Sequence, residues 1–404
     1  MPWRETQKME ERMAFISDWR RLMKSDPQQL SMAELCRNYG VSRKSGYALV
    51  GRYEEKGVAA FSDASHAPHS NPHAVTGSRA SAIVEVRQEH PTWGPKKIRA
   101  WLKRKRPGQI WPVESTIGEL LDRHGLVKRR QRRRHVAPCA YGLTAALAPN
   151  DVWGVDFKGW FRTGDGRRCD PFSLSDLMSR YVLRLQAVGR TDTEHVWPIF
   201  DAAFREFGTP KIMRSDNGAP FASGGVAGLS RLAVRLIKAG VMPERIEPGK
   251  PQQNGRHERL HLTVKNDTAS PPAATVRAQQ ERFDSFRQVF NEERPHEALG
   301  QTSPAEHYMP SGRSYSGRLT EPEYPLDQAV RRVRTTGEIK WKGNLVFIGE
   351  ALIGEPVGID ETEDGLFLVA YGPVRLGWLD SEANFTARRA GVDPSTAPQP
   401  QPPG

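Results

Sequence analysis

The chain has 404 residues, a formal net charge of +12, and three cysteines too few and too scattered for a disulfide framework or a paired zinc spacing. We find no run of about 18 apolar residues that could cross a membrane, and MPWRETQKMEERMAF lacks the apolar segment of a signal peptide. A reducing compartment is therefore expected, and the excess of Lys and Arg favours a polyanionic partner, because binding phosphates releases counterions.

Residues 9–60 are typical of a small helical unit. Ser31 and Glu34 have the spacing of a capping box at the start of a helix that ends at Gly40. A second helix begins at Ser42 and is basic near its start, so the pattern predicts a helix-turn-helix rather than an ordinary helical hairpin. Its expected core residues are Met32, Leu35, Cys36, Tyr39, Val41 and Val50. The residues expected to contact DNA are Arg43, Lys44 and Tyr47.

A second unit of the same kind is expected over residues 78–135. Helices are predicted over residues 79–90, over residues 94–105 and from Glu114 onward. The arginine-rich segment that follows is too densely charged to fold on itself, and we expect it to be an arm that binds nucleic acid. Its candidate DNA-binding residues are Arg129, Arg130, Arg132, Arg133 and Arg134.

Residues 150–295 alternate between strand-like and helical patterns. Three successive strand-like runs are followed by a helix, a strand, a helix, a strand and two further helices. This order predicts an α/β domain with a mixed five-stranded sheet.

Three carboxylates in this domain suit metal-dependent phosphoryl transfer. Asp156 lies in the first expected strand, Asp216 closes the fourth, and Glu258 lies at the start of a helix. Carboxylates bind hard divalent cations, and two such ions can clamp the attacking and leaving oxygens of a phosphodiester. In a basic chain, this order predicts an enzyme that cuts and joins DNA. Repulsion among the charges is expected to destabilise the site unless metal is bound or one carboxylate is protonated.

A rival motif overlaps the third carboxylate. The run from His257 to His261 matches H-E-x-x-H, the zinc-metalloprotease signature, and Glu281 lies at a plausible distance for a third ligand. A protease would leave the two helix-turn-helix units unexplained. The two hypotheses differ in what they require, because the protease needs both histidines and the nuclease needs Asp156 and Asp216.

Residues 330–385 have short strand-like runs with Gly-rich turns, which predict a small β-barrel. The Pro-rich residues 386–404 are expected to be a disordered tail. The expected domains are a helix-turn-helix at 1–65, a linker at 66–77, a second helix-turn-helix at 78–135, a linker at 136–149, a catalytic core at 150–310, a linker at 311–329 and the barrel at 330–385.

At the three carboxylates, the chain resembles the DDE transposases of bacterial insertion sequences, whose catalytic core is similar to that of retroviral integrases. The segments PNDVWGVDFKG, RSDNGAPF and PGKPQQNGRHERLH are similar to the family's three motifs and place its catalytic residues on Asp156, Asp216 and Glu258. NEERPHEALGQTSPAEHY is similar to the segment after the core, whose N-x-x-R-P-H run falls here on Asn291, Arg294, Pro295 and His296.

The resemblance implies a multidomain protein with all-α helix-turn-helix units, a central ribonuclease H-like core and a C-terminal β-barrel. It implies a transposase that binds the terminal repeats of its mobile element and catalyses DNA cleavage and strand transfer. Asp156, Asp216 and Glu258 would hold Mg²⁺, for which Mn²⁺ may substitute. A DNA-binding regulator with an inactive transposase core remains the alternative, beside the zinc protease.

The resemblance also implies the surroundings of the site and the partners. Lys265 and His261 are expected to contact DNA phosphate near the cut, with Asn217, Gly218 and Asn254 as supporting residues. The expected partners are double-stranded DNA, as element ends and as target, and further copies of the chain assembled on DNA. No membrane is expected, and the location would be the bacterial cytoplasm, at the nucleoid.

Overall fold

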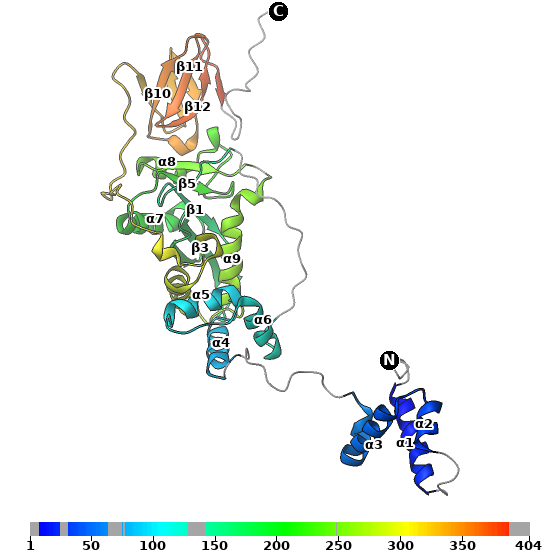
Figure 1. Ribbon diagram of the computed structural model, residues 1–404. Helices are drawn as coiled ribbons and strands as arrows, with labels where there is room; N and C mark the ends of the chain where they lie inside the picture. The colour runs from blue at the N-terminus through cyan, green and yellow to red at the C-terminus, as the bar shows by residue number, and fades with distance from the viewer. Residues whose placement is uncertain are drawn as a thin grey trace, which may run out of the picture. The chain divides into compact units, whose positions relative to one another are not determined.

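The computed structural model describes residues 8–24, 31–63, 75, 77–127, 142–247 and 249–387. The chain divides into two compact units, residues 1–74 and residues 75–404, which are treated separately below (Figure 1). The arginine-rich arm expected from the sequence, with Arg129, Arg130, Arg132, Arg133 and Arg134, lies outside the described residues, as does the tail from residue 388. None of the helices in the described ranges is long and apolar enough to cross a bilayer.

The N-terminal unit contains the predicted helix-turn-helix preceded by a further helix. Its helices are α1 Lys8–Lys24, α2 Met32–Asn38 and α3 Arg43–Lys56. The capping box is present, because the Ser31 side chain accepts from the Glu34 backbone N–H while the Glu34 carboxylate accepts from the Ser31 N–H. Gly46 lets α3 approach α2 closely, since a Cβ there would lie 2.6 Å from the Cys36 sulfur. The expected core is confirmed, and Phe15 and Ile16 of α1 complete it.

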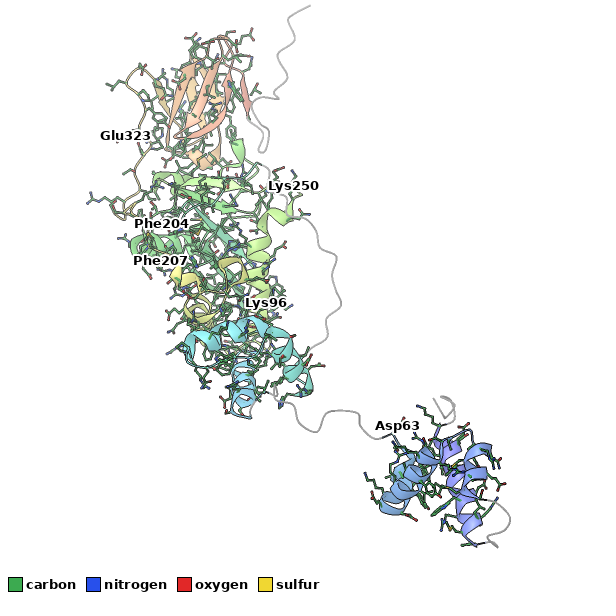
Figure 2. The ribbon with its side chains drawn as sticks, viewed as in Figure 1. Asp63, Lys96, Phe204, Phe207, Lys250 and Glu323 are labelled. Carbon is green, nitrogen blue, oxygen red and sulfur yellow. The ribbon has the colours of Figure 1, made fainter. Side chains whose placement is uncertain are left out.

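The second group of helices, α4 to α6 and called the second helical unit below, lies in the same compact part of the chain as the α/β core, residues 75–404. Its helices are α4 Gly77–Glu89, α5 Pro95–Lys105 and α6 Glu114–Arg123. Helix α5 contacts the core through charged side chains: Lys96, labelled in Figure 2, has its Nζ 2.7 Å from a Glu297 oxygen. Arg104 lies 3.1 Å from Glu306. Arg104 also donates to the Glu293 carbonyl at 2.8 Å. One face of this unit is therefore occupied by the core and is not free for DNA.

The central α/β core is built on a mixed sheet whose middle strand is β1. The strands are β1 Val152–Phe157, β2 Phe161–Arg162, β3 Arg168–Asp176, β4 Val182–Val188, β5 Ile212–Ser215 and β6 Met242–Arg245. Strands β1, β3 and β4 form the predicted antiparallel meander, whereas β5 and β6 run parallel to β1. The sequence missed β2, which continues the line of β1 along β3 after a break at Gly159, where φ is +89°.

Helices cover both faces of this sheet. They are α7 Thr193–Phe207, α8 Arg231–Lys238, α9 Gly255–Thr268 and α10 Val276–Gln288. Helices α7 and α8 pack on one face through an aromatic-rich cluster that includes Phe200, Phe204 and Leu232 (Figures 1 and 2). Helices α9 and α10 pack on the other face through Leu260 and Phe283. The predicted α/β core with a mixed sheet is confirmed, with β2 as a sixth strand, and its packing fixes α9 against β1 and β3.

The C-terminal residues form an open sheet with a separate hairpin. Their strands are β7 Ala329–Arg332, β8 Glu338–Trp341, β9 Asn344–Phe347, β10 Pro356–Glu361, β11 Phe367–Tyr371, β12 Val374–Leu379 and β13 Phe385–Ala387. The sheet order is β13-β12-β11-β10-β7, and β8 pairs with β9. Over residues 329–387 the edge strands β7 and β13 do not pair with each other, so the expected closed barrel is not shown. Val357 and Val369 of this sheet share a buried cluster with Val234 of α8.

Candidate active site

The first two predicted carboxylates lie near one another because their strands are neighbours. Asp156 is in β1, opposite Ser173 of β3, and its side chain points toward α9 while Val155 and Phe157 pack in the aromatic cluster on the other face. Strand β5 runs parallel to β1 and ends at Ser215, immediately before Asp216. Parallel neighbours present their carboxyl ends at the same edge of a sheet, so the two side chains share that edge.

Local hydrogen bonds fix the turn that carries Asp216. The Gly218 N–H donates to Asp216 Oδ1 at 3.0 Å, and the Asn217 amide donates to the Ile246 carbonyl at 2.8 Å. A Cβ at residue 218 would lie 3.1 Å from Asp216 Oδ2, which favours glycine at this position. Asn217 and Gly218 therefore hold the turn that carries Asp216.

The third carboxylate approaches from α9. Glu258 is exposed in the first turn of the helix, where the positive end of the helix dipole favours a negative charge. Asn254 directly precedes this helix, and its amide donates to Asp156 Oδ2 at 2.7 Å. Asn254 thus links the start of α9 to the Asp156 carboxylate in β1.

The charges of the three carboxylates act on one another. The pKa of Asp156 is raised from 3.8 to about 7, first by burial and then by the negative charge of Asp216, with a smaller contribution from Glu258. The hydrogen bond from Asn254 opposes this rise. The side chain of Asp156 is only 13% exposed, so water screens the repulsion weakly. Burial and the neighbouring carboxylates together favour the protonated form of Asp156.

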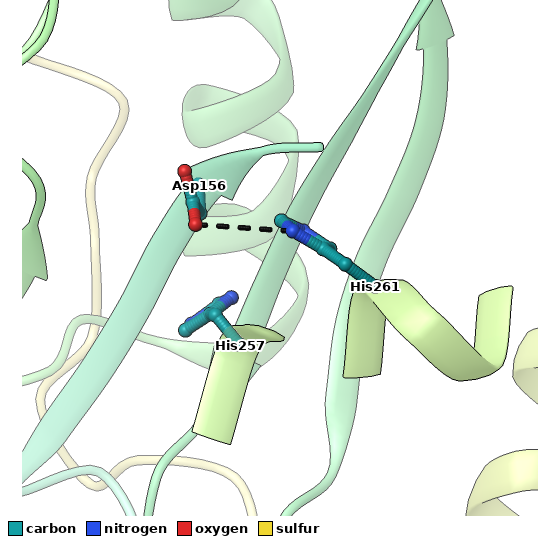
Figure 3. Close-up of side chains that lie close together, drawn as sticks. All are labelled: Asp156, His257 and His261. Atoms are coloured by element: carbon teal, nitrogen blue, oxygen red, sulfur yellow. Dashed lines mark ion pairs between the residues drawn. The ribbon is translucent and has the colours of Figure 1, made fainter. Parts of the chain in front are cut away.

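Two histidines of α9 lie on the inner side of Asp156 (Figure 3). His261 Nε2 lies 2.8 Å from Ser173 Oγ, and its Nδ1 lies 3.8 Å from Asp156 Oδ2. His257, only 2% exposed, has Nε2 at 3.4 Å from Ser175 Oγ. Residues four apart on a helix are about 6 Å apart along its axis, which is close to the roughly 7 Å between alternate residues of a strand. The two imidazoles therefore match two successive residue pairs of β1 and β3.

This packing explains the presence of glycine in the middle of β1. Gly154 pairs with Ser175, and a Cβ at Gly154 would lie 2.3 Å from His257 Nε2. The sequence analysis missed Gly154, Ser173 and Ser175. Small residues at alternate positions in otherwise apolar strands are the available signal, because they indicate a face on which large side chains from another element pack. They also leave room for α9 to approach β1, so that the charge of Glu258 acts on Asp156.

Burial changes the interpretation of the two histidines. The pKa of His257 is lowered to about 4 and that of His261 to about 3, in both cases chiefly by burial. The contact between His261 and Asp156 therefore joins a neutral imidazole to a carboxyl group and is not an ion pair. The DNA-phosphate contact expected of His261 is contradicted by its position, because the side chain is buried, neutral and bonded to Ser173.

The structure does not assemble the zinc-protease site. Asp156, His257 and His261 could together offer ligand atoms to a metal ion, but Glu281 is not among them. Glu281 lies on the exposed surface of α10, 3.4 Å from Arg277. Glu258, which would be the general base, points away from the buried histidine face and is exposed. The H-E-x-x-H match therefore reflects the face of α9 that packs on the sheet, and not a zinc site.

The remaining predicted residues lie at the surface or hold the fold together. Arg43, Lys44 and Tyr47 are exposed on α3 of the N-terminal unit, and Lys265 is exposed on α9. Lys158, which sequence reasoning missed, follows Asp156 by two residues, and its pKa is lowered by burial and by the charge of Lys265. The two lysines therefore lie within electrostatic range of each other beside the site.

The N-x-x-R-P-H run has a structural role. The Asn291 side chain accepts from the Val182 N–H at 2.8 Å and donates to the Val182 carbonyl at 2.9 Å, which fastens the chain after α10 to β4. Arg294 lies 3.3 Å from Asp267 of α9, and Thr92 of the second helical unit donates to the same carboxylate at 3.4 Å. This run joins the core's last helices to its sheet and to the second helical unit.

Family models match four stretches of the chain. Integrase core domain models match residues 146–251 and residues 239–304, which together contain all three carboxylates. A homeodomain-like domain model matches residues 45–121, and the C-terminal domain model of the IS481 family transposases matches residues 328–386. The matches therefore extend from the helix-turn-helix to the C-terminal sheet.

The individual relatives and solved structures have low sequence identity to this chain. The 31.7 kDa protein of insertion element IS407 from Burkholderia multivorans is 28% identical over 229 residues, covering 56% of this chain and 79% of that protein. The magnesium complex of the HTLV-2 integrase catalytic core, in its trimeric form, is 14% identical with a TM-score of 0.32 and covers 40% of this chain and 98% of that chain. A chain of the simian T-cell lymphotropic virus intasome, solved with the PP2A regulatory subunit B56 gamma, is 13% identical with a TM-score of 0.37. The match covers 77% of this chain and 100% of that chain. With structural scores this low, the similarity to insertion-sequence transposases that carry an integrase core rests on the family models and the insertion-element relative.

Proposed function

We propose that this transposase binds the terminal repeats of its own mobile element and catalyses metal-dependent DNA cleavage and strand transfer with Asp156, Asp216 and Glu258. The observation that carries the proposal is geometric: β1 and β5 are parallel neighbours whose carboxyl ends bear Asp156 and Asp216, and Asn254 at the start of α9 donates to Asp156. In agreement with this arrangement, burial and the two neighbouring carboxylates raise the pKa of Asp156 to about 7. Placing three acidic groups from β1, the end of β5 and the start of α9 within range of one another is unfavourable in the absence of a cation. Bound divalent ions would offset that repulsion.

The donors fit magnesium. All three are carboxylates, the hard oxygen ligands that Mg²⁺ and Mn²⁺ prefer. Asp156 and Asp216 would hold one ion, and Asp156 and Glu258 the other. When bound, such ions lower the pKa of an attacking water and offset the charge that develops on the phosphodiester. The amide of Asn254 orients the Asp156 carboxylate, and the N–H of Gly218 orients that of Asp216.

The rest of the chain would position DNA. Arg43, Lys44 and Tyr47 on α3 would read the terminal repeat, together with α6 of the second helical unit, because α5 is engaged with the core. The arginine-rich segment before the core would follow phosphates or enter a minor groove, and Lys265 would contact phosphate near the cut. Element ends must be paired before transfer, so we infer a dimer or larger assembly on DNA. The domain limits proposed for these roles are those derived from the sequence.

The test is strand cleavage and joining on a labelled duplex that carries the element's own end. Wild type is compared with Asp216→Asn, with Mg²⁺, Mn²⁺ or a chelator. We expect nicked and joined products with either metal, and at least a hundredfold fewer products from the variant, in line with the loss of a principal electrostatic contribution to a transition state. Specific binding of the duplex without cleavage under either metal would refute the catalytic proposal and favour a DNA-binding regulator.

A further inference from the structure

Trp160 is a large aromatic side chain that the fold leaves in solvent. It lies between β1 and β2, four residues beyond Asp156, and its side chain is 54% exposed. The hairpin that carries it is well anchored, because the Lys158 N–H donates to the Pro171 carbonyl at 3.0 Å and the Gly164 N–H donates to the Ala273 carbonyl at 2.9 Å. Trp160 is thus an exposed aromatic ring on a rigid extension of the catalytic strand.

Two arginines accompany the ring. The guanidinium carbon of Arg162 lies 5.6 Å from the Trp160 ring centroid, and that of Arg168 lies 5.4 Å from it. Arg162 and Arg168 are paired in the register of β2 and β3, so both side chains are on the same face of the hairpin. Further hydrogen bonds hold each one, to the Gly166 carbonyl at 2.7 Å and to Asp170 at 2.6 Å respectively. The ring and both guanidinium groups form one preorganised patch, called the Trp160 patch below.

The charge and chemistry of the patch fit a nucleic acid strand. The hairpin sequence from Lys158 to Asp170 contains four cationic residues and two acidic residues, Asp165 and Asp170, the second of which pairs with Arg168. An aromatic face flanked by guanidinium groups is how proteins hold unpaired nucleotides, with the base stacked on the ring and the phosphates near the cations. A strand rises about 3.4 Å per residue, so Trp160 is at most about 14 Å from Asp156 along the chain. That distance corresponds to roughly four nucleotides at duplex spacing.

We propose that the Trp160 patch binds an unpaired nucleotide of the DNA strand near the cut, with the base stacked on Trp160 and the neighbouring phosphates contacted by Arg162 and Arg168. The position relative to the cut rests on the proposed function, whereas the stacking itself requires neither metal nor cleavage. The interaction would hold open a few base pairs at the DNA end that enters the active site. A purely structural role for the ring, as a cation–π contact within the hairpin, makes a different prediction about DNA affinity.

The test uses the full chain in a chelator-containing buffer, so that cleavage plays no part. One probe is a fluorescein-labelled twelve-nucleotide oligo(dT), and the other is an abasic strand of the same length and charge. We expect Trp160→Ala to weaken oligo(dT) binding by about tenfold or more while leaving the abasic strand unchanged, and Trp160→Phe to retain most of the affinity. Phe347→Ala serves as a matched control, because Phe347 is 52% exposed on the C-terminal part and should not affect either probe.

The arginines give an independent reading. Replacing both Arg162 and Arg168 with Ala should weaken both probes and reduce the slope of log affinity against log salt by about 1.4, at about 0.7 for each phosphate contact. Wild-type protein photocrosslinked to a 5-bromodeoxyuridine-substituted strand should carry the label on Trp160, a result that does not depend on any variant folding. Any of three results would overturn the proposal. Trp160→Ala could lose affinity equally for both probes, it could bind oligo(dT) within twofold of wild type, or the wild-type crosslinks could be confined to other residues. Strand cleavage by the same preparation reports separately on the proposed function.

Discussion

Replacing Asp156 with Asn should stabilise the metal-free protein while abolishing its activity. Asp156 is mostly buried, and its pKa in the folded protein is about 7, against an ordinary value of 3.8. One pKa unit corresponds to about 1.4 kcal/mol, so above pH 7 the buried charge lowers the free energy of unfolding by about 4 kcal/mol at most. Asn has nearly the same shape without the charge and can still accept the hydrogen bond from Asn254. For a domain of roughly 150–250 residues, this gain corresponds to a rise in Tm of at most about 16 °C.

The pH dependence of this effect has a defined sign. Below about pH 4, Asp156 is protonated in both the folded and the unfolded chain, and wild type and variant should unfold alike. Between about pH 4 and pH 7 the unfolded chain loses the proton while the folded protein keeps it, so the stability of wild type falls relative to the variant as pH rises. Above about pH 7 the difference is complete. Mg²⁺ should raise the Tm of wild type and should have much less effect on the variant.

Scanning calorimetry of the full chain, with chelator or with Mg²⁺ and at pH values from 4 to 8, measures this difference. Asp176→Asn is a matched control, because Asp176 is a fully buried carboxylate that accepts from the Asn150 N–H at 2.8 Å and from the Ser179 N–H at 2.7 Å. It should destabilise the core, since an amide nitrogen cannot accept these bonds. If Asp156→Asn is no more stable than wild type at pH 8 without metal, the three carboxylates do not repel one another as described, and the argument for a metal site fails with it.

Three further substitutions test how the site is held. Gly154→Ala should destabilise the core by about 1–3 kcal/mol and reduce cleavage, because the new Cβ meets His257. Gly189→Ala is the control and should have neither effect, because a Cβ there meets nothing within 4 Å. Urea unfolding measures the change in stability, and the cleavage assay measures the change in activity. Asn291→Ala should lower the free energy of unfolding by about 1–3 kcal/mol, since it leaves the buried Val182 N–H and carbonyl unpaired, and amide exchange at Val182 should accelerate; unchanged exchange would contradict the fastening role. Ser31→Ala should cost the N-terminal unit about 1 kcal/mol through loss of the capping box, read as a lower Tm for that unit with the core transition unmoved.

The order of secondary structure could be predicted because each element carries its own local signal. The capping box at Ser31 starts α2, and apolar residues at helical spacing from Val196 to Phe207 mark the buried face of α7. Antiparallel pairing of β1, β3 and β4 followed from the short turns between them. The strand-strand-helix order of Asp156, Asp216 and Glu258 in turn predicted that the three carboxylates lie near one edge of the sheet.

Features that depend on contacts between distant residues could not be predicted in this way. The docking of α5 through Lys96 and Arg104 depends on Glu297 and Glu306, about two hundred residues later, and a lone charged residue gives no sign of its partner. The closed barrel was expected because short strands with Gly-rich turns are compatible with either an open or a closed sheet. The interruption of β1 at Gly159 was missed because a glycine in a strand is equally compatible with a turn or a bulge.

The histidines of α9 show how a sequence can match the H-E-x-x-H motif without forming a zinc site. Two imidazoles one helical turn apart meet the Gly154–Ser175 pair and the Asp156–Ser173 pair, so the H-x-x-x-H spacing follows from packing a helix on a strand pair. Glu258 is adjacent to His257 in sequence, and a helix turns about 100° per residue, which carries its side chain from the buried face toward the catalytic edge. Any substitution that moves His257 therefore also moves Glu258. The buried histidines hold the first turn of α9, and with it Glu258, against the small residues of β1 and β3 beneath them.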